Sequence, residues 1–295
     1  MNVGKPENSF ELIDAFIKEF QSMKNLSNNN IQNTEINNIN QNTATNNSPT
    51  ETMTISPQNN NINDQPPDKN VNKDISDLLY EKAYILYRMK KNDEALTAVD
   101  NFLETGGESN LTPRGFFLKG EILSEKGDFK SAIIEYEKVA KKLPGSKLEI
   151  AATKRIADCI FSIRMDEKDN LKKALGIFET LRNRTDVPDE FMTQIKYSIG
   201  RCHEEMGAVQ NALHFYNDVV FSSPLEHQKA RDSVWIIRSA EAAVRLYLKQ
   251  YRETGKTDMI FCAKEIYDKL ISRGIQPTYQ FKQEKKNLDT ILEIK

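Results

Sequence analysis

Apolar side chains recur at steps of three and four from about residue 75 onward, which predicts a series of amphipathic helices. One set of small, aromatic and proline residues appears twice with a constant offset of 80 positions: Gly120, Gly127, Ala132, Tyr136 and Pro144 recur as Gly200, Gly207, Ala212, Tyr216 and Pro224. The first glycine allows two helices to approach closely, and the second ends the first helix with a positive φ. The alanine and tyrosine share the inner face of the second helix, which the proline ends. These spacings predict tandem helical hairpins.

Two further copies fit the same template, one around Ala83 and Ala95 and one around Ala157 and Ala174. Beyond residue 225 the pattern loosens, but it still predicts a fifth pair of helices and a final helix that is charged on one side. Helical repeat arrays need such a polar terminal helix to close the stack. We expect hairpins at about residues 76–110, 113–147, 150–187, 193–226 and 229–273, followed by a capping helix at 279–294.

The best copy resembles the tetratricopeptide repeat. The residues that carry the resemblance are Gly120, Gly127, Phe129, Ala132, Tyr136 and Pro144, at the small, glycine, aromatic, alanine, aromatic and proline positions of that family. The resemblance runs from about residue 75 to residue 225. It implies an all-α fold, a TPR-like α-solenoid of helix-turn-helix repeats over residues 75–295, and a role in binding other proteins.

The segment LPGSKLEIAATKRIADCIF, residues 143–161, is also similar to bacterial envelope repeat proteins of outer-membrane assembly and of the Tol-Pal system. Those proteins carry an export signal or a lipoprotein cysteine, and this chain shows neither. We therefore expect a cytoplasmic protein. The alternative is a periplasmic or envelope-associated protein whose export signal is missing from this chain.

The N-terminal quarter has a different composition. Asn makes up 17 of the 48 residues from 25 to 72, and no aromatic residue lies between Phe20 and Tyr80. Such a segment buries too little apolar surface to offset its ordering entropy, so we expect a disordered arm with a linker at residues 25–74. Within residues 1–24, apolar side chains at helical spacing predict a short amphipathic helix at residues 9–23. This helix could dock on the repeats in cis, mediate self-association, or recruit a separate protein.

Charge and hydropathy exclude several classes of protein. The formal net charge is −2, which argues against nucleic acid as a partner. Residues 1–74 carry five Lys or Arg against nine Asp or Glu, and the remaining residues carry 36 against 34. No apolar run reaches the length of about 18 residues that a transmembrane helix needs. The low hydrophobic share of 38% thus reflects dilution by the Asn-rich arm rather than a weak core.

The sequence offers no site for chemistry. His203 begins the segment HEEMG, but Gly207 stands where a zinc motif of the H-E-x-x-H type requires its second histidine. Cys159 and Cys202 occupy the same position in successive repeats, which predicts buried small hydrophobic residues. A nucleophilic Cys202 is disfavoured because its neighbour His203 points about 100° away on a helix. We therefore expect no enzyme, no cofactor and no metal.

A binding surface is the remaining prediction. The resemblance implies that the first helix of each hairpin lines the concave face of the superhelix. The residues at the corresponding positions are Tyr80, Tyr84, Tyr87, Phe117, Glu121, Lys154, Asp158, Tyr197, Arg201 and Glu204. Aromatic and arginine side chains are frequent interface anchors. We expect a non-enzymatic scaffold or adaptor that binds a peptide or helix of another protein. The alternative is an envelope protein or a regulatory subunit of a multiprotein complex, with the N-terminal helix as a docking or autoinhibitory element.

Overall fold

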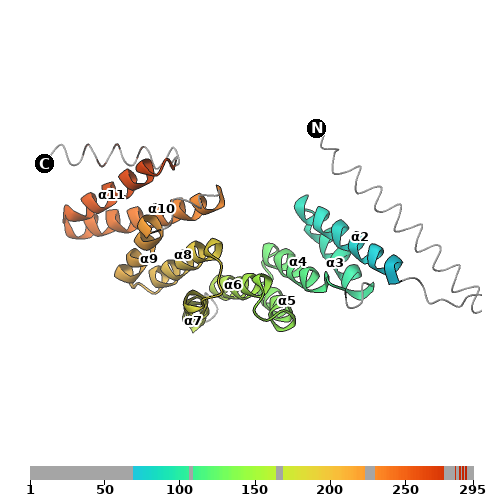
Figure 1. The fold of residues 1–295 in the computed structure, drawn as a ribbon. Helices are drawn as coiled ribbons and strands as arrows, with labels where there is room; N and C mark the ends of the chain where they lie inside the picture. Colours follow the sequence, from blue (N-terminus) through green and yellow to red (C-terminus); the bar gives the residue numbers. More distant parts are fainter. Residues whose placement is uncertain are drawn as a thin grey trace, which may run out of the picture. The chain divides into compact units, whose positions relative to one another are not determined.

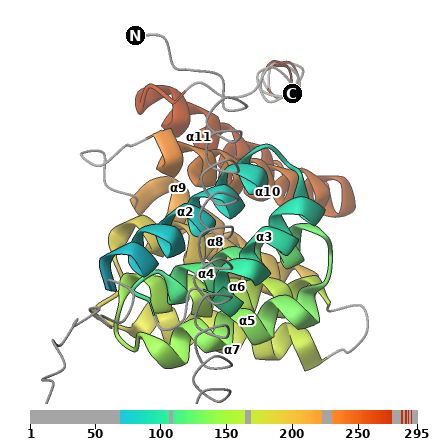
Figure 2. The ribbon, with the colours of Figure 1, turned by 90° about the vertical axis from the view of Figure 1, so that its right-hand side faces the viewer.

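The computed structural model describes residues 69–105, 109–163, 169–222 and 230–275, together with residues 283, 286, 288 and 290. Helix follows helix along these ranges (Figures 1 and 2). In chain order the helices are α2 (Lys69–Arg88), α3 (Asn92–Thr105), α4 (Thr112–Glu125), α5 (Phe129–Lys142), α6 (Lys147–Ser162), α7 (Asp169–Asn183), α8 (Asp189–Glu205), α9 (Val209–Ser222), α10 (Ala230–Thr254) and α11 (Asp258–Ser272). The described residues contain no strand, so the prediction of an all-α fold built from tandem helix pairs is confirmed.

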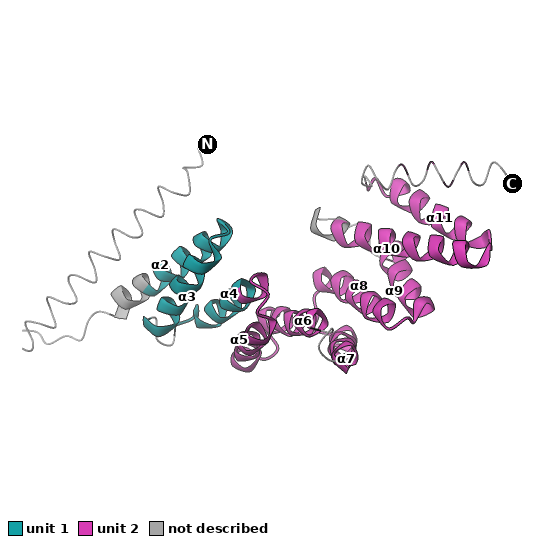
Figure 3. Cartoon of the chain, turned by 180° about the vertical axis from the view of Figure 1, so that it is seen from behind, with its two compact units in different colours: residues 1–122 teal, residues 123–295 magenta. Residues whose placement is uncertain are grey.

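The chain divides into two compact units, residues 1–122 and residues 123–295 (Figure 3). The first unit holds α2, α3 and most of α4. In the second unit, α5 packs on α6 and each later helix packs on the next, so that α6–α7, α8–α9 and α10–α11 form successive hairpins. The first helices of these three hairpins also meet, because α8 contacts both α6 and α10.

Short turns with one left-handed residue join the helices of several pairs. Gly127 and Gly207 have φ values of +84° and +75°, and Lys90 takes the equivalent place with φ of +62°. In each turn the next backbone N–H bonds back five residues, for example from Asp128 to the carbonyl of Leu123 at 2.9 Å. This is the hydrogen bond of a Schellman motif, which satisfies the last carbonyl groups of the first helix.

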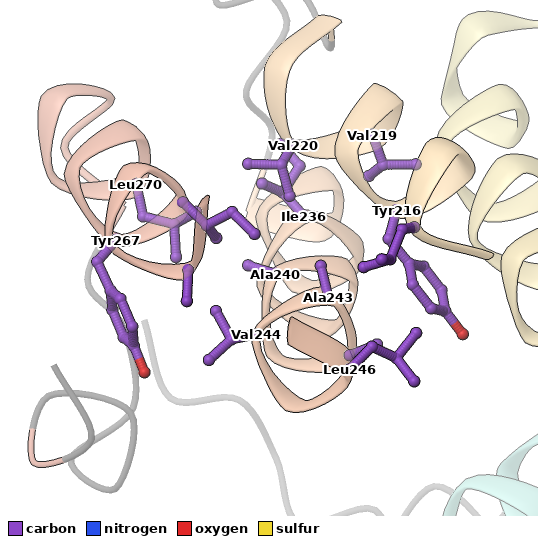
Figure 4. Packing of buried hydrophobic residues seen from close by; sticks show 14 of the residues in the cluster. Tyr216, Val219, Val220, Ile236, Ala240, Ala243, Val244, Leu246, Tyr267 and Leu270 are labelled. Atoms are coloured by element: carbon purple, nitrogen blue, oxygen red, sulfur yellow. The ribbon is translucent and has the colours of Figure 1, made fainter. Parts of the chain in front are cut away.

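Tyrosine and small residues fill the core of the second unit near its C-terminal end. Figure 4 shows α10 lying between α9 and α11, with Ala243 of α10 on the side of Tyr216 and Ala240 on the side of Leu270. All of these side chains are at most 1% exposed. Close packing of α9, α10 and α11 therefore makes one continuous core.

Two glycines mark points where helices approach closely. A Cβ atom placed on Gly200 would lie 2.6 Å from Cε1 of the buried Tyr216 ring. A Cβ atom on Gly115 would overlap the ring of Phe102. The tandem pattern pointed to Gly200 but not to Gly115, because Gly115 has no glycine at the matching position of the other repeats.

Some boundaries differ from those expected. The predicted N-terminal helix and the predicted linker up to residue 68 lie outside the described residues, but α2 begins at Lys69, inside the segment assigned to the linker. The linker was predicted to extend to residue 74 because this segment has few apolar side chains. The first turns of a helix form through backbone hydrogen bonds and do not require apolar side chains, so α2 begins earlier. Helix α6 begins at Lys147 because the Ser146 side chain accepts a hydrogen bond from the N–H of Glu149 at 3.0 Å, so residue 147 opens a repeat instead of ending one.

The predicted capping helix is described at only four positions, all of them helical. Among these, Leu288 is 2% exposed and joins the core of α9, α10 and α11. None of the described helices combines the length and the apolar character that crossing a membrane requires.

Candidate functional site

Three neighbouring helices of the second unit bring aromatic and cationic side chains together. Helices α6, α8 and α10 place Lys154, Tyr197 and Trp235 at related positions, with steps of 43 and 38 residues along the chain. Because α8 contacts α6 and α10, these side chains meet across the three helices. We call the following set the α6–α8–α10 cluster: Lys154, Asp158, Phe161, Tyr197, Arg201, Trp235 and Arg238.

Aromatic rings form the centre of the cluster. The ring of Tyr197 lies 5.4 Å from that of Trp235, with an angle of 49° between the ring planes. On its other side, Tyr197 lies 5.8 Å from the buried ring of Tyr216. Tyr197 and Trp235 are half-buried, so each keeps part of its ring accessible. Ring pairs at such distances stabilise each other beyond the apolar area that they bury.

Three cations lie over these rings. The guanidinium carbon of Arg201 is 4.3 Å from the centre of the Phe161 ring and 6.0 Å from that of Tyr197. The guanidinium carbon of Arg238 is 4.7 Å from the centre of the Trp235 ring, and the Lys154 ammonium is 6.0 Å from the same ring. Attraction between a cation and a ring face fixes the position of the long side chains.

One carboxylate balances part of this charge. Asp158 accepts a hydrogen bond from the Lys154 ammonium at 2.8 Å, and the Arg155 guanidinium lies 3.8 Å from the same carboxylate oxygen. Lys154 is only 5% exposed, so its charge needs this partner. Lys154 therefore acts inside the cluster, whereas Arg201 and Arg238 are exposed.

Glu204 has a structural role next to the cluster. Its two oxygens accept hydrogen bonds from the Tyr216 hydroxyl at 2.8 Å and from the Arg245 guanidinium at 2.6 Å. Burial, with the nearby Glu204 charge, raises the pKa of Tyr216 far above its usual value. Burial alone would lower the pKa of Arg245, but the hydrogen bond and the charge of Glu204, together with Tyr216 and Tyr197, outweigh it and the pKa is raised. Both oxygens of Glu204 are thus engaged within the protein.

The tyrosines of α2 form a separate aromatic surface in the first unit. The rings of Tyr80 and Tyr84 lie 6.4 Å apart and nearly parallel, and Arg88 donates a hydrogen bond to the Tyr84 hydroxyl at 3.1 Å. Tyr84 is 37% exposed, whereas burial raises the pKa of Tyr80. Tyr87 lies beneath the Lys90 ammonium at 5.4 Å.

The ten predicted face residues thus fall into two groups. Those of α2 and α4, including the half-buried Phe117 and Glu121, belong to the first unit, and those of α6 and α8 belong to the second. Within the second unit the structure brings Lys154, Asp158, Tyr197 and Arg201 into one cluster.

Sequence reasoning missed the two members that α10 contributes to the cluster, Trp235 and Arg238. Both lie in α10, where the repeat pattern is loose. A signal was nevertheless present: Trp235 is the single tryptophan of the chain and follows Tyr197 by 38 residues, close to the repeat period.

Cysteine and histidine side chains show no arrangement for chemistry in the described part of the chain. Cys159 and Cys202 are at most 1% exposed. His203 stacks on Phe215 with ring centres 5.6 Å apart, and burial lowers its pKa. Among the described residues, no group of His, Cys, Asp or Glu could hold a metal ion.

Comparison with known proteins places this fold in a class, that of helical repeat proteins. Residues 113–141 match the family model of the tetratricopeptide repeat, and the described helices follow one another in tandem pairs. Tetratricopeptide repeats generally form protein-interaction scaffolds. No curated protein sequence matches the chain.

Several solved structures are similar in fold. A human IFIT1 dimer with PPP-AAAA is 19% identical, covers 74% of this chain and 47% of its own, and gives a TM-score of 0.51. The chain thus spans about half the length of IFIT1. BtubC from P. vanneervenii is 14% identical, covers 72% of this chain and 86% of its own, and gives a TM-score of 0.49. A thermophilic TPR protein from Thermus thermophilus is 11% identical, covers 65% and 98% of the two chains, and gives a TM-score of 0.44. At these identities the similarity concerns the fold alone.

Proposed function

We propose that the chain is a non-enzymatic scaffold that binds a peptide or helix of another protein on the surface formed by α6, α8 and α10. The observation that carries this proposal is the α6–α8–α10 cluster, where partly accessible rings and exposed guanidinium groups meet on three adjacent helices. Tyr, Trp and Arg are the residues that most often dominate binding energy at protein interfaces. Rigid aromatic groups also lose little conformational entropy when a ligand binds.

A peptide library tests this proposal. Random peptides displayed on phage are selected on the full chain, and the affinities of the enriched peptides are measured by fluorescence anisotropy. We expect the substitution of Tyr197 and Arg201 by Ala to weaken binding by tenfold or more, the loss typical of interface anchors. The control is Phe261→Ala, which removes a large side chain that is 58% exposed on α11, outside the cluster. The proposal would be contradicted if the selection enriched no peptide. It would also be contradicted if peptides bound equally well to the variant with Tyr197 and Arg201 replaced and to the Phe261→Ala control.

The N-terminal segment is a second candidate ligand for the repeats. Residues 1–74 carry an excess of acidic side chains, and the cluster carries more cations than carboxylates. We propose that residues 9–23 dock on the repeats of the same chain or of a second copy. Deletion of residues 1–24 should then raise the affinity for selected peptides, because an intramolecular competitor has been removed. An unchanged affinity, together with an unchanged mass in light scattering, would reject both forms of docking.

We also propose that the protein acts in the cytoplasm, as a free scaffold or as a regulatory subunit. Thiols at Cys159, Cys202 and Cys262 that form no disulfide with one another are compatible with a reducing compartment. Fractionation of the native host tests this proposal, and recovery in the envelope fraction would favour the envelope alternative.

A further inference from the structure

We propose that the ligand of the α6–α8–α10 cluster is an acidic peptide of a separate protein. Its Asp or Glu side chains would pair with Arg201 and Arg238, and a neighbouring apolar side chain would pack on Tyr197 and Trp235. This inference rests on the proposed function and adds the chemical class of the ligand.

Each of the two exposed arginines of the cluster lies over an aromatic ring. A guanidinium group is planar, and its five N–H donors lie in the plane, at the edge of the group. Arg201 lies over Phe161 and Arg238 lies over Trp235, with the guanidinium carbons 4.3 and 4.7 Å from the ring centres. Both side chains are exposed, so their N–H donors are accessible to a ligand, and the attraction to the rings favours their position in the cluster. A planar carboxylate matches such an edge with two parallel hydrogen bonds.

The positive charges of the cluster outnumber its carboxylates. Among the described residues, neither Arg201 nor Arg238 has an ion-pair partner, although both are exposed. The single carboxylate of the cluster, Asp158, is already bonded to Lys154 and lies close to Arg155. Glu204, the nearest predicted acid on α8, is engaged by Tyr216 and Arg245. The cluster therefore has an excess of positive charge that a ligand with carboxylates would complement.

The accessible rings of the cluster suit an apolar side chain of the ligand. Tyr197 and Trp235 are half-buried rings that touch each other between the two arginines along the cluster. An apolar side chain that covers them removes apolar surface from water, and it also excludes water from the neighbouring ion pairs. The ligand is thus expected to place an apolar residue between acidic residues.

The single tryptophan makes the test specific to this site. Trp235 is the only tryptophan of the chain, so its fluorescence reports binding at the cluster and nowhere else. The probe is a synthetic peptide of about twelve residues without tryptophan, blocked at both ends, in which Asp and Glu flank Leu and Phe. A matched peptide has Asn and Gln in place of Asp and Glu. Both are titrated against the full chain, with Trp235 emission and calorimetry as independent readouts.

We expect the acidic peptide to change Trp235 emission and to bind at least about tenfold more tightly than its amide counterpart at low salt. The preference should decrease as salt rises, because exposed charges are screened. Substitution of both Arg201 and Arg238 by Gln should abolish the preference. Arg252→Gln, which removes an exposed arginine in the last turn of the same helix α10, should retain it.

Several results would overturn the inference. Equal affinity for the acidic and amide peptides would show that the surface binds peptides without discriminating by charge. The proposed function would then still hold, and the inference about an acidic ligand would be wrong. Tight binding of the acidic peptide without a change in Trp235 emission, or unaltered by the double substitution, would place the site elsewhere. Stronger binding of a short single-stranded RNA would assign the rings and arginines to base stacking and phosphate contacts instead. If library peptides bind and the acidic peptide does not, only the inference about charge fails.

Discussion

At Gly200, a hydrogen atom in place of a side chain lets α8 approach α9. The Tyr216 ring fills the space that a Cβ atom would occupy, and this ring is fully buried, with its hydroxyl bonded to Glu204. Burial and this hydrogen bond both oppose a displacement of the ring. The sequence alone identified the glycine from its recurrence at Gly120, but the identity of the residue packed against it came from the structure.

Gly200→Ala should therefore lower the free energy of unfolding by about 1–3 kcal/mol, the usual cost of overpacking a core. The matched control is Gly176→Ala in α7, where nothing lies within 4 Å of the new Cβ. That change should be neutral or should stabilise by up to about 1 kcal/mol, because alanine favours helix. Urea unfolding followed by circular dichroism measures both. Equal effects of the two substitutions would contradict the packing argument.

Lys90 offers a second test at the residue scale. It holds a φ of +62°, the conformation that glycine supplies at Gly127 and Gly207. Lys90→Gly should stabilise the protein by up to about 1 kcal/mol, because the relief of left-handed strain exceeds the gain in unfolded-state entropy. The reciprocal change Gly127→Lys should destabilise it by a similar amount. Thermal unfolding of the two variants and of the native chain measures the change in stability. A change of the same sign in both variants would contradict this prediction.

At the scale of elements, an ion-pair network joins the start of α6 to the segment between α7 and α8. Arg184 donates two hydrogen bonds to Glu149, at 3.0 and 2.8 Å, and two more to Asp186. The hydrogen bond from Arg184 outweighs burial and lowers the pKa of Glu149. Such a link orients successive hairpins, because it bridges residues 35 positions apart.

The pKa of Glu149 predicts a dependence on pH. A carboxylate whose pKa is lower in the folded state contributes stability above its unfolded pKa of about 4.3, and that contribution is lost as the pH falls through the folded value. Glu149→Gln should cost about 1–2 kcal/mol at pH 7, and the cost should shrink below about pH 4. Unfolding in urea between pH 7 and pH 3 measures the difference. A cost that stays constant with pH would show that the charge of Glu149 is irrelevant.

The helices themselves were the most predictable elements. Apolar periodicity and the recurring glycines located the pairs, since both reflect local geometry that every repeat must satisfy. Boundaries set by hydrogen bonds rather than by apolar side chains, such as the starts of α2 and α6, were missed. The interaction between α6, α8 and α10 was predictable only in part, because it depends on how far α10 departs from the repeat. Trp235 and Arg238 thus entered the cluster only with the structure.

At the scale of the whole molecule, the described helices of the second unit pack mainly on their neighbours in the chain. Stability in such an array is a sum of terms for single repeats and for interfaces between adjacent repeats. Local damage should therefore spread only to adjacent pairs. In hydrogen exchange, Gly200→Ala should speed deuterium uptake in α8 and α9, less in α7 and α10, and not at all in α2 and α3. Uniform acceleration in all helices would indicate a single cooperative unit instead.

The chain also carries two natural probes of this behaviour in its buried thiols. Cys159 in α6 and Cys202 in α8 occupy equivalent positions in consecutive repeats and are almost inaccessible, while Cys262 is only half-buried. A thiol-reactive reagent can modify the first two only when their repeats open. We expect Cys262 to be labelled first in the native protein, with mass spectrometry resolving the order. Equal labelling rates at Cys159 and Cys202 would mean that the two repeats open in one event. Unequal rates would mean that each repeat opens with its own frequency, and the natural cysteines measure it without any substitution.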